Sequence, residues 1–294
     1  MGRVAKTSIS AMAHDGQNLT PVPNAISVNF LLQFFPIDRL INIVVTSSSR
    51  SVEDRLNRTS IGSFLCLGFS TLLGVFFIAA ALWLWGAREV RGDQGEVFVL
   101  TLVGVVWLAI SYQLFPWLGL NIRDDAIERQ NHAALIASCS ALISVSIAYA
   151  AGNLGEGPTY EENIFCAGLS TGGMFLLWLI YEAATHVSRS ITEERDLASG
   201  FRFGGLLLAW GLILARAVTG NWHGANSAMH DFFHDGWLAS IMCLVGIGVE
   251  LLLKPSRSRP FPSWPSCGLL PGLVYVVAAA AYVWHLGRWE GMPQ

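Results

Sequence analysis

Seven long apolar runs constrain this chain more than any other feature of its sequence. Only 13% of the 294 residues are charged and 53% are hydrophobic, whereas soluble domains carry about 25% charged residues. A helix needs about 20 apolar residues to cross the hydrocarbon core of a bilayer, and open strands would leave backbone groups unpaired there. The runs cover residues 63–86, 96–118, 133–151, 164–184, 203–219, 237–253 and 268–287. The sequence therefore predicts an all-α, polytopic transmembrane helical bundle with about seven spans.

A helical hairpin occurs twice in the chain. The copies cover about residues 96–153 and 163–221, and each consists of an apolar run, a short charged turn and a second apolar run. When Asn131 is aligned with Asp196, the acidic and small residues around them also coincide. Spans 2 and 4 cross the membrane in the same direction, so we predict two parallel repeats related by an axis near the membrane normal.

Residues 1–60 form a separate N-terminal segment, ahead of a transmembrane domain over residues 61–294. Within it, residues 25–45 contain an apolar run that Pro36, Asp38 and Arg39 interrupt. Burying the two charges at mid-bilayer would cost about 2.5–3.5 kcal/mol each. We therefore predict an interfacial amphipathic helix rather than an eighth span, with a plain linker as the alternative.

The basic residues in the loops predict how the chain is oriented. With seven spans, the turns after spans 2, 4 and 6 hold eight Lys and Arg residues, whereas the opposite loops hold three. Positively charged short loops stay in the cytoplasm. We expect a cytoplasmic N-terminus, an outer C-terminus and both charged turns on the cytoplasmic side.

Composition and motifs also exclude several classes of function. The net charge is −3 and no polybasic tract is present, which argues against a nucleic-acid partner. The five cysteines form no CxxC pair, so we interpret them as small buried residues rather than metal ligands or disulfides. No nucleophile elbow, phosphate loop or dinucleotide loop is present. The sequence predicts neither an enzyme nor a cofactor.

Small residues concentrate in spans 3 to 5. Gly168 and Gly172 in span 4, and Gly200 and Gly204 in span 5, have the GxxxG spacing. Helices in lipid associate by close packing, which small residues permit. We predict that spans 3 to 5 form the tightly packed centre of the bundle.

The charged turns are the first candidate site. Glu128 and Asn131 lie in the first turn, and Arg195 and Asp196 lie in the second. Asn and acidic residues at these positions cap the free N–H groups of the following helix and suit the positive end of its dipole. The alternative is a shared polar site where the two turns meet.

Ionisable residues near the ends of spans are the second candidate. Glu182 lies near the end of span 4, and Glu250 precedes Lys254 by four residues, a favourable helical pair. Arg216 lies within the apolar part of span 5. A charge there is either functional, facing the bundle interior, or extends to the outer interface.

Three histidines between spans 5 and 6 are the third candidate. His230 and His234 are four residues apart, a spacing that can place two metal ligands on one helix face, and His223 precedes them. No third ligand is fixed by a known motif. We favour an amphipathic segment on the outer interface, with a zinc or copper site as the alternative.

The segments 127–134 and 191–200, followed by Phe-Arg-Phe-Gly-Gly, carry a resemblance to a known family. The doubled charged turn, with Asn or Asp before an Ala- and Gly-rich helix, resembles the DUF350 family of bacterial inner-membrane proteins, also called UPF0719. The resemblance covers about residues 96–221 and leaves spans 6 and 7 outside it. It implies a multi-pass inner-membrane protein, supplies no activity, and carries the usual suggestion of a link to envelope stress.

Taken together, these features favour a non-enzymatic passage for ions or small solutes in the lipid bilayer, as a single chain or a homo-oligomer. The alternative is a structural or envelope-stress scaffold that uses residues 1–60 to hold a cytoplasmic partner. A third hypothesis is a metal-dependent enzyme that uses His223, His230 and His234. The predicted polar residues of the passage are Asn131, Asp196, Glu128, Arg195, Glu182 and Arg216.

Overall fold

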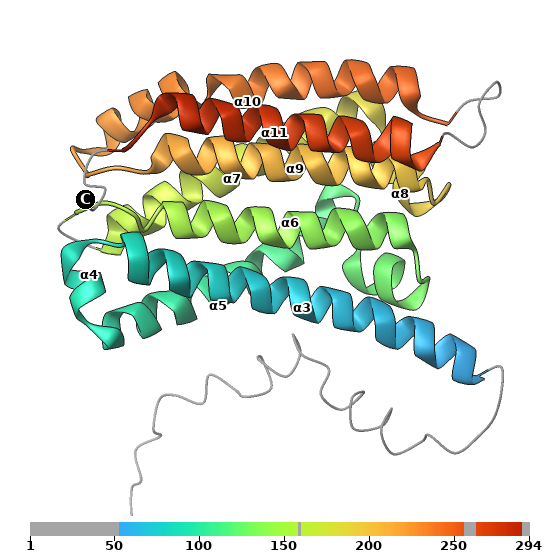
Figure 1. The fold of residues 1–294 in the computed structure, drawn as a ribbon, viewed down its shortest axis with the longest axis horizontal. Coiled ribbons are helices and arrows are strands. Elements are labelled where there is room, and N and C mark those ends of the chain that lie inside the picture. Colours follow the sequence, from blue (N-terminus) through green and yellow to red (C-terminus); the bar gives the residue numbers. More distant parts are fainter. Residues whose placement is uncertain (1–52, 158–159, 256–262, 290–294) are drawn as a thin grey trace, which may run out of the picture. The chain divides into compact units, whose positions relative to one another are not determined.

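The structure is a computed structural model that describes residues 53–157, 160–255 and 263–289 (Figure 1). The predicted interfacial helix over 25–45 lies outside these residues. Seven helices in the described part are long and apolar enough to span a membrane, which confirms the predicted polytopic helical bundle. They cover Ile61–Trp85, Gln94–Leu118, His132–Ala151, Tyr160–Thr185, Leu197–Val218, Ala225–Leu253 and Pro265–Leu286.

The spans are built from long α-helices joined by short helical turns. The long helices are α3 (Glu53–Trp85), α5 (Gln94–Leu114), α6 (His132–Ala151), α7 (Tyr160–Thr185), α9 (Leu197–Val218), α10 (Ala225–Leu253) and α11 (Leu270–Leu286). The short ones are α4 (Arg88–Gly92), the 3₁₀-helix η1 (Phe115–Leu118), the π-helices η2 (Ile122–Glu128) and η3 (Pro265–Leu269), and α8 (Val187–Thr192).

The long helices form two layers. Helices α3, α6, α9 and α11 lie in a row and run in the same direction, and each contacts the next (Figure 1). Helices α5, α7 and α10 return the chain in the opposite direction. Helix α7 contacts both α6 and α9, and α10 contacts α7 and α9. We call the end of the bundle at which α6 and α9 begin the cap end.

Helices α6 and α9 form the centre of the bundle. They are 72% and 78% buried, whereas the other five spans are 22–39% buried. A methyl group added at Gly200 would lie 2.8 Å from the backbone of Ala133, and one at Gly204 would lie 2.7 Å from the Ser140 hydroxyl. The glycines of α9 therefore allow its backbone to approach α6 closely, as the spacing predicts.

The prediction of close packing is wrong for span 4. Gly172 in α7 is exposed, and a methyl group added there would meet no atom within 4 Å. A methyl group at Gly168 would come no closer than 3.9 Å to Trp107. Helix α7 contacts the centre through Cys166, Ala167 and other residues of a different face. GxxxG spacing permits close approach, but it does not determine which face of a helix is used.

Helix α11 packs on α9 much as α9 packs on α6. A methyl group at Gly268 would lie 2.6 Å from the backbone of Ala198, and one at Gly272 would lie 2.6 Å from the Phe201 carbonyl. Span 7 therefore extends the row of close helix contacts beyond the two predicted hairpins.

The cysteines are only partly as predicted. None of the five forms a disulfide; Cys166 and Cys243 are buried, but Cys66 is exposed on α3. The interpretation of all five as buried residues is therefore wrong for Cys66, because α3 lies at one end of the row and packs through a single face.

Candidate functional site

Both charged turns end in a side chain that caps the next helix. The side-chain oxygen of Asn131 accepts hydrogen bonds from the N–H groups of Ala133 and Ala134, at 3.0 and 3.3 Å. The carboxylate of Asp196 accepts from Ala198 and Ser199, at 3.2 and 2.9 Å. Each cap satisfies two N–H groups that a helix start leaves unpaired.

The backbone also follows the same path in the two turns. The N–H groups of residues 129 and 131 donate to the carbonyls of residues 124 and 125, and those of 194 and 196 donate to 189 and 190. Gln130 and Arg195 both have left-handed backbone angles, with φ of 52° and 54°. These hydrogen bonds and angles of the first turn recur 65 residues later, whereas the turns begin differently: Asn121 is extended and His186, 65 residues on, is left-handed.

The two turns touch each other, but they do not form one polar site. The amide of Asn131 donates to the Ile191 carbonyl in the second turn, at 2.6 Å. Asn131 is buried and uses both ends of its amide in these contacts. The carboxylate of Asp196 also accepts from the Ser199 hydroxyl, within its own helix. The capping interpretation therefore explains Asn131 fully, and Asp196 in part.

Three other predicted residues lie apart from any shared cavity. Glu128 and Arg195 are exposed, and Glu128 accepts from Arg123 at 3.1 Å. Glu182 accepts from the N–H and the hydroxyl of Ser188, at 2.9 and 2.5 Å, and so supports the start of α8. Their contacts hold the turns in place.

A buried ion pair beside the second turn is the most unusual feature of the described structure. Nε and Nη2 of Arg202 donate to the two carboxylate oxygens of Glu250, at 2.7 and 2.8 Å. Both side chains are 1% exposed. Glu250 was predicted to pair with Lys254; its carboxylate instead pairs with Arg202 because it faces α9. A bidentate pair of this kind is strong and geometrically specific.

Four elements meet at this pair and satisfy its remaining groups. The Arg202 Nη1 group donates to the Cys267 carbonyl in η3. The Tyr181 hydroxyl from α7 donates to Glu250, at 3.3 Å, and the Ser199 hydroxyl lies 2.7 Å from Glu250. Asp196 lies 3.8 Å from Arg202. We call Asp196, Ser199, Arg202, Glu250 and Tyr181 the cap-end cluster.

Sequence analysis missed this cluster, although a signal was present. Arg202 is one of the eight basic residues that predict the orientation, yet it is the sixth residue of α9, about 7 Å from the helix start at 1.5 Å per residue. Glu250 lies three residues before the end of α10, about 5 Å from it. Opposite charges at the same depth in two spans are a detectable pattern, because each needs a partner in lipid.

A second, more exposed cluster lies at the opposite end of α9. Nη1 of Arg216 lies 3.6 Å from the Asp235 carboxylate, and the Arg216 side chain is 11% exposed. Asp235 is also 2.9 Å from Nδ1 of His234, and its carbonyl accepts from the Tyr282 hydroxyl at 3.0 Å. Arg216 therefore faces the interface with α10 instead of extending alone to the surface.

The three histidines do not converge on one point. Helix α10 begins at Ala225, so His230 and His234 lie on its first turns rather than on a loop, with ring centroids 6.0 Å apart. Each pairs with the Asp that follows it, and both are mostly exposed. Within the described ranges, no group of three or more His, Cys, Asp or Glu residues is arranged to hold a metal.

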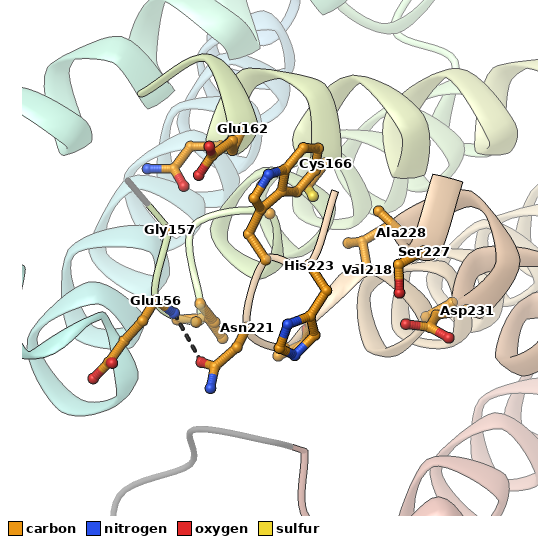
Figure 2. A pocket seen from close by; sticks show the side chains of 18 residues that line it. Glu156, Gly157, Glu162, Cys166, Val218, Asn221, His223, Ser227, Ala228 and Asp231 are labelled. Carbon is orange, nitrogen blue, oxygen red and sulfur yellow. Dashed lines mark hydrogen bonds between the residues drawn. The ribbon is translucent and has the colours of Figure 1, made fainter. Parts of the chain in front are cut away.

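His223 lines a small pocket between the α6–α7 and α9–α10 connections (Figure 2). The connections are held together where Asn221 accepts from the Glu156 N–H, at 3.0 Å. The pocket has a volume of about 50 Å³, enough for a few water molecules. The carboxylates of Glu156, Glu162 and Asp231 lie at separate edges of it (Figure 2). The pocket is therefore a small hollow at one end of the bundle, and its carboxylates do not converge on a common point.

Comparison with known proteins gives one match. Residues 162–261 match the family model described as Domain of Unknown Function (DUF350). No curated protein and no solved structure matches the chain. The match covers α7 to α10, so it includes α10, which the predicted resemblance left out, and contains the whole cap-end cluster. The matched family is the one that the second charged turn resembles.

Proposed function

We propose that this chain is a non-enzymatic membrane protein that passes an ion or a small solute along the interface of α9 and α10. The observation that carries the proposal is the Arg202–Glu250 pair, which lies inside two membrane-spanning helices. Ionisable groups within spans are costly, face the bundle interior and mark ion and solute pathways. Stability alone does not explain why the pair is there, because a protein with apolar residues of similar volume in place of a buried ion pair is often equally stable.

The charges are distributed along this interface in a way that suits a passage. Arg202 and Arg216 lie 14 residues apart on α9, about 21 Å along the axis. Each pairs with an acid of α10, Glu250 or Asp235. An ion pair therefore stands near either end of the α9–α10 interface.

The stretch between the two ion pairs is apolar and closed. Leu206, Trp210 and Ile213 are fully buried, and the Trp210 ring N–H donates to the Ala239 carbonyl of α10 at 3.1 Å. Passage would therefore require α10 to move against α9. Helix α10 packs extensively on α9 and also contacts α7, so such a movement has to break these contacts.

We further propose that the protein lies in a bacterial inner membrane with its N-terminus in the cytoplasm. The excess of basic residues in the loops on the N-terminal side supports this orientation. The cap-end cluster would then lie near the cytoplasmic surface. The recurrence of caps and backbone angles 65 residues apart supports an origin of the two hairpins as parallel repeats.

A scaffold remains the second candidate, and a different observation favours it. The α6–α9 contact is closed by glycine and alanine, and the buried hydroxyls of Ser144 and Ser146 in α6 donate to carbonyls of their own helix. Such a closely packed centre suits a protein that holds a cytoplasmic partner through residues 1–60 or assembles with further copies of itself.

Flux measurements on the full chain in proteoliposomes separate the two candidates. We expect wild-type protein to carry protons or monovalent cations, measured with entrapped pH- and ion-sensitive dyes. Glu250→Gln should lower the rate at least about tenfold, the size of a 1.4 kcal/mol change in barrier. The exposed Glu128→Gln is the matched control and should leave the rate unchanged.

A variant that is safe for folding completes the design. Arg202→Met combined with Glu250→Met removes both charges and keeps similar volume, so the protein should fold, but flux should be lost. If wild-type protein shows no flux with any cation, or if the double variant matches it, the passage is wrong and the scaffold is favoured.

A further inference from the structure

One hydroxyl group lies between two buried carboxyl groups in the cap-end cluster. The Ser199 oxygen is 2.7 Å from Oδ2 of Asp196 and 2.7 Å from Oε1 of Glu250. The same oxygen accepts a hydrogen bond from Nη2 of Arg202, at 2.9 Å. Ser199 is fully buried. All three of its neighbours are therefore charged or ionisable groups at hydrogen-bonding distance.

The number of available protons does not match three charged neighbours. A serine hydroxyl has one proton to donate and two lone pairs that accept. Arg202 occupies one lone pair, and the proton can serve only one of the two carboxyl groups. The other O···O contact, at 2.7 Å, has the length of an O–H···O hydrogen bond, so it needs a proton of its own. That proton can come only from the carboxyl group.

The charges lead to the same result. Arg202 supplies one positive charge for the two carboxyl groups of Asp196 and Glu250. The ionisable side chains that face the pair from α7 and α11 are Tyr181 and Tyr275, which are neutral hydroxyls. With one carboxyl group protonated, the cluster has no net charge, which a low-dielectric interior favours strongly.

An unused hydroxyl group beside the cluster adds an independent observation. Tyr275 of α11 is 6% exposed, and its hydroxyl has no hydrogen-bond partner among the described residues. It interacts electrostatically with both Glu250 and Arg202. A buried hydroxyl group without a partner is rare, and this one leaves a proton donor or acceptor within electrostatic range of Glu250.

We infer that Asp196, Ser199 and Glu250 hold one shared proton and form a proton-binding site. Its role as a step in ion passage rests on the proposed function; its existence does not. The proton moves between the carboxyl groups through the hydroxyl of Ser199. When Asp196 gives its proton to the Ser199 oxygen, the hydroxyl proton passes to Glu250, so two O–H bonds break, two form, and the negative charge moves from Glu250 to Asp196.

Neither carboxyl group holds the proton by default, which is what a relay requires. The Asp196 carboxylate is stabilised by two N–H groups at the positive end of α9. The Glu250 carboxylate is stabilised by the two N–H groups of Arg202. Both anionic forms have strong donors, so the proton can shift at little cost.

Infrared spectroscopy of the full chain in lipid tests the site directly. A protonated carboxyl group has a C=O stretching band that is separate from the carboxylate bands. We expect wild-type protein to show this band at neutral pH, equivalent to one group per chain. Asp196→Asn should abolish it, and it should fold because Asn caps the equivalent helix at Asn131. Asp125→Asn, at a buried carboxylate of the first turn, is the matched control and should retain the band.

The outcomes distinguish the proton site from the passage. If the band is absent in wild-type protein, or persists unchanged in both Asp196→Asn and Glu250→Gln, the proton site is overturned whatever the flux. If the band behaves as expected while wild-type protein shows no flux, the proton site is supported and the proposed ion passage is wrong. Ser199→Ala should shift the band, because it removes the group that accepts the proton's hydrogen bond; an unshifted band contradicts the relay.

Discussion

The two charged turns share a backbone but differ in chemistry. The first turn ends in the neutral cap Asn131, and the second ends in the acidic cap Asp196. The residues 65 positions before Ser199, Arg202 and Glu250 are Ala134, Ala137 and Thr185, which carry no charge and are all buried. The caps and left-handed residues form without the charges of the second turn, so the turn does not need the cap-end cluster in order to fold.

The difference arises from what each turn packs against. Asn131 meets the backbone of the second turn, and its amide donates to the Ile191 carbonyl. The second turn meets α10 and η3, which bring Glu250 and the Cys267 carbonyl to Arg202. The same local structure can therefore serve packing in one turn and hold a charged site in the other.

The largest effect is expected when only the cation of the second turn is removed. Arg202→Ala introduces the residue type found 65 positions earlier, at Ala137, but leaves the carboxyl groups of Asp196 and Glu250 buried without their partner. Breaking a buried pair in this way costs about 3–5 kcal/mol. Unfolding of the purified protein by denaturing detergent measures this change. Arg195→Ala, which removes an exposed arginine of the same turn, should cost far less. Equal losses for the two variants would show that the Arg202–Glu250 pair contributes no more to stability than an exposed charge.

The next largest effect should come from exchanging the two caps, and it should be asymmetric. Asn131→Asp removes the donor to the Ile191 carbonyl and sets a carboxylate against that oxygen, so we expect a loss of about 2–3 kcal/mol. Asp196→Asn keeps a capping side chain and removes one of the two carboxyl groups that share a single arginine, so its loss should stay below about 1 kcal/mol. The same detergent titration measures both variants. Similar losses for the two exchanges would mean that the turns have the same surroundings.

A smaller effect is expected from the two GxxxG pairs. Gly200→Ala places a methyl group 2.8 Å from the backbone of Ala133, and overpacking of this kind costs about 1–3 kcal/mol. Gly172→Ala meets open space, and the gain in helix propensity should offset any loss. Stability in detergent separates the two glycines. If Gly172→Ala lowers the stability as much as Gly200→Ala does, Gly172 must be in contact with another molecule, such as a second copy of the chain.

The features that could be predicted from the sequence are local ones. The number of spans follows from the length of each apolar run, and the caps at Asn131 and Asp196 follow from residue types at a helix start. The pairing of Arg202 with Glu250 depends on which face of α10 meets α9, and no local rule gives that. The same limit explains why the spacing of Gly168 and Gly172 predicts close contacts that do not form. It also explains why no prediction covers Gly268 and Gly272, which do pack closely on α9.

The smallest effect is expected at the left-handed residue of each turn, and it tests the backbone angles that the turns share. Gln130 and Arg195 have left-handed angles, which cost a residue with a side chain about 1–2 kcal/mol. Glycine adopts these angles freely, but it loses about 0.5–1 kcal/mol of conformational entropy on folding. Arg195→Gly should therefore stabilise the protein by about 0.5–1 kcal/mol, measured by the same detergent unfolding. Gln130→Gly should stabilise it less, because the Gln130 side chain makes an interaction that glycine would lose. If Arg195→Gly does not stabilise the protein, the left-handed angle of the second turn carries no cost in the membrane.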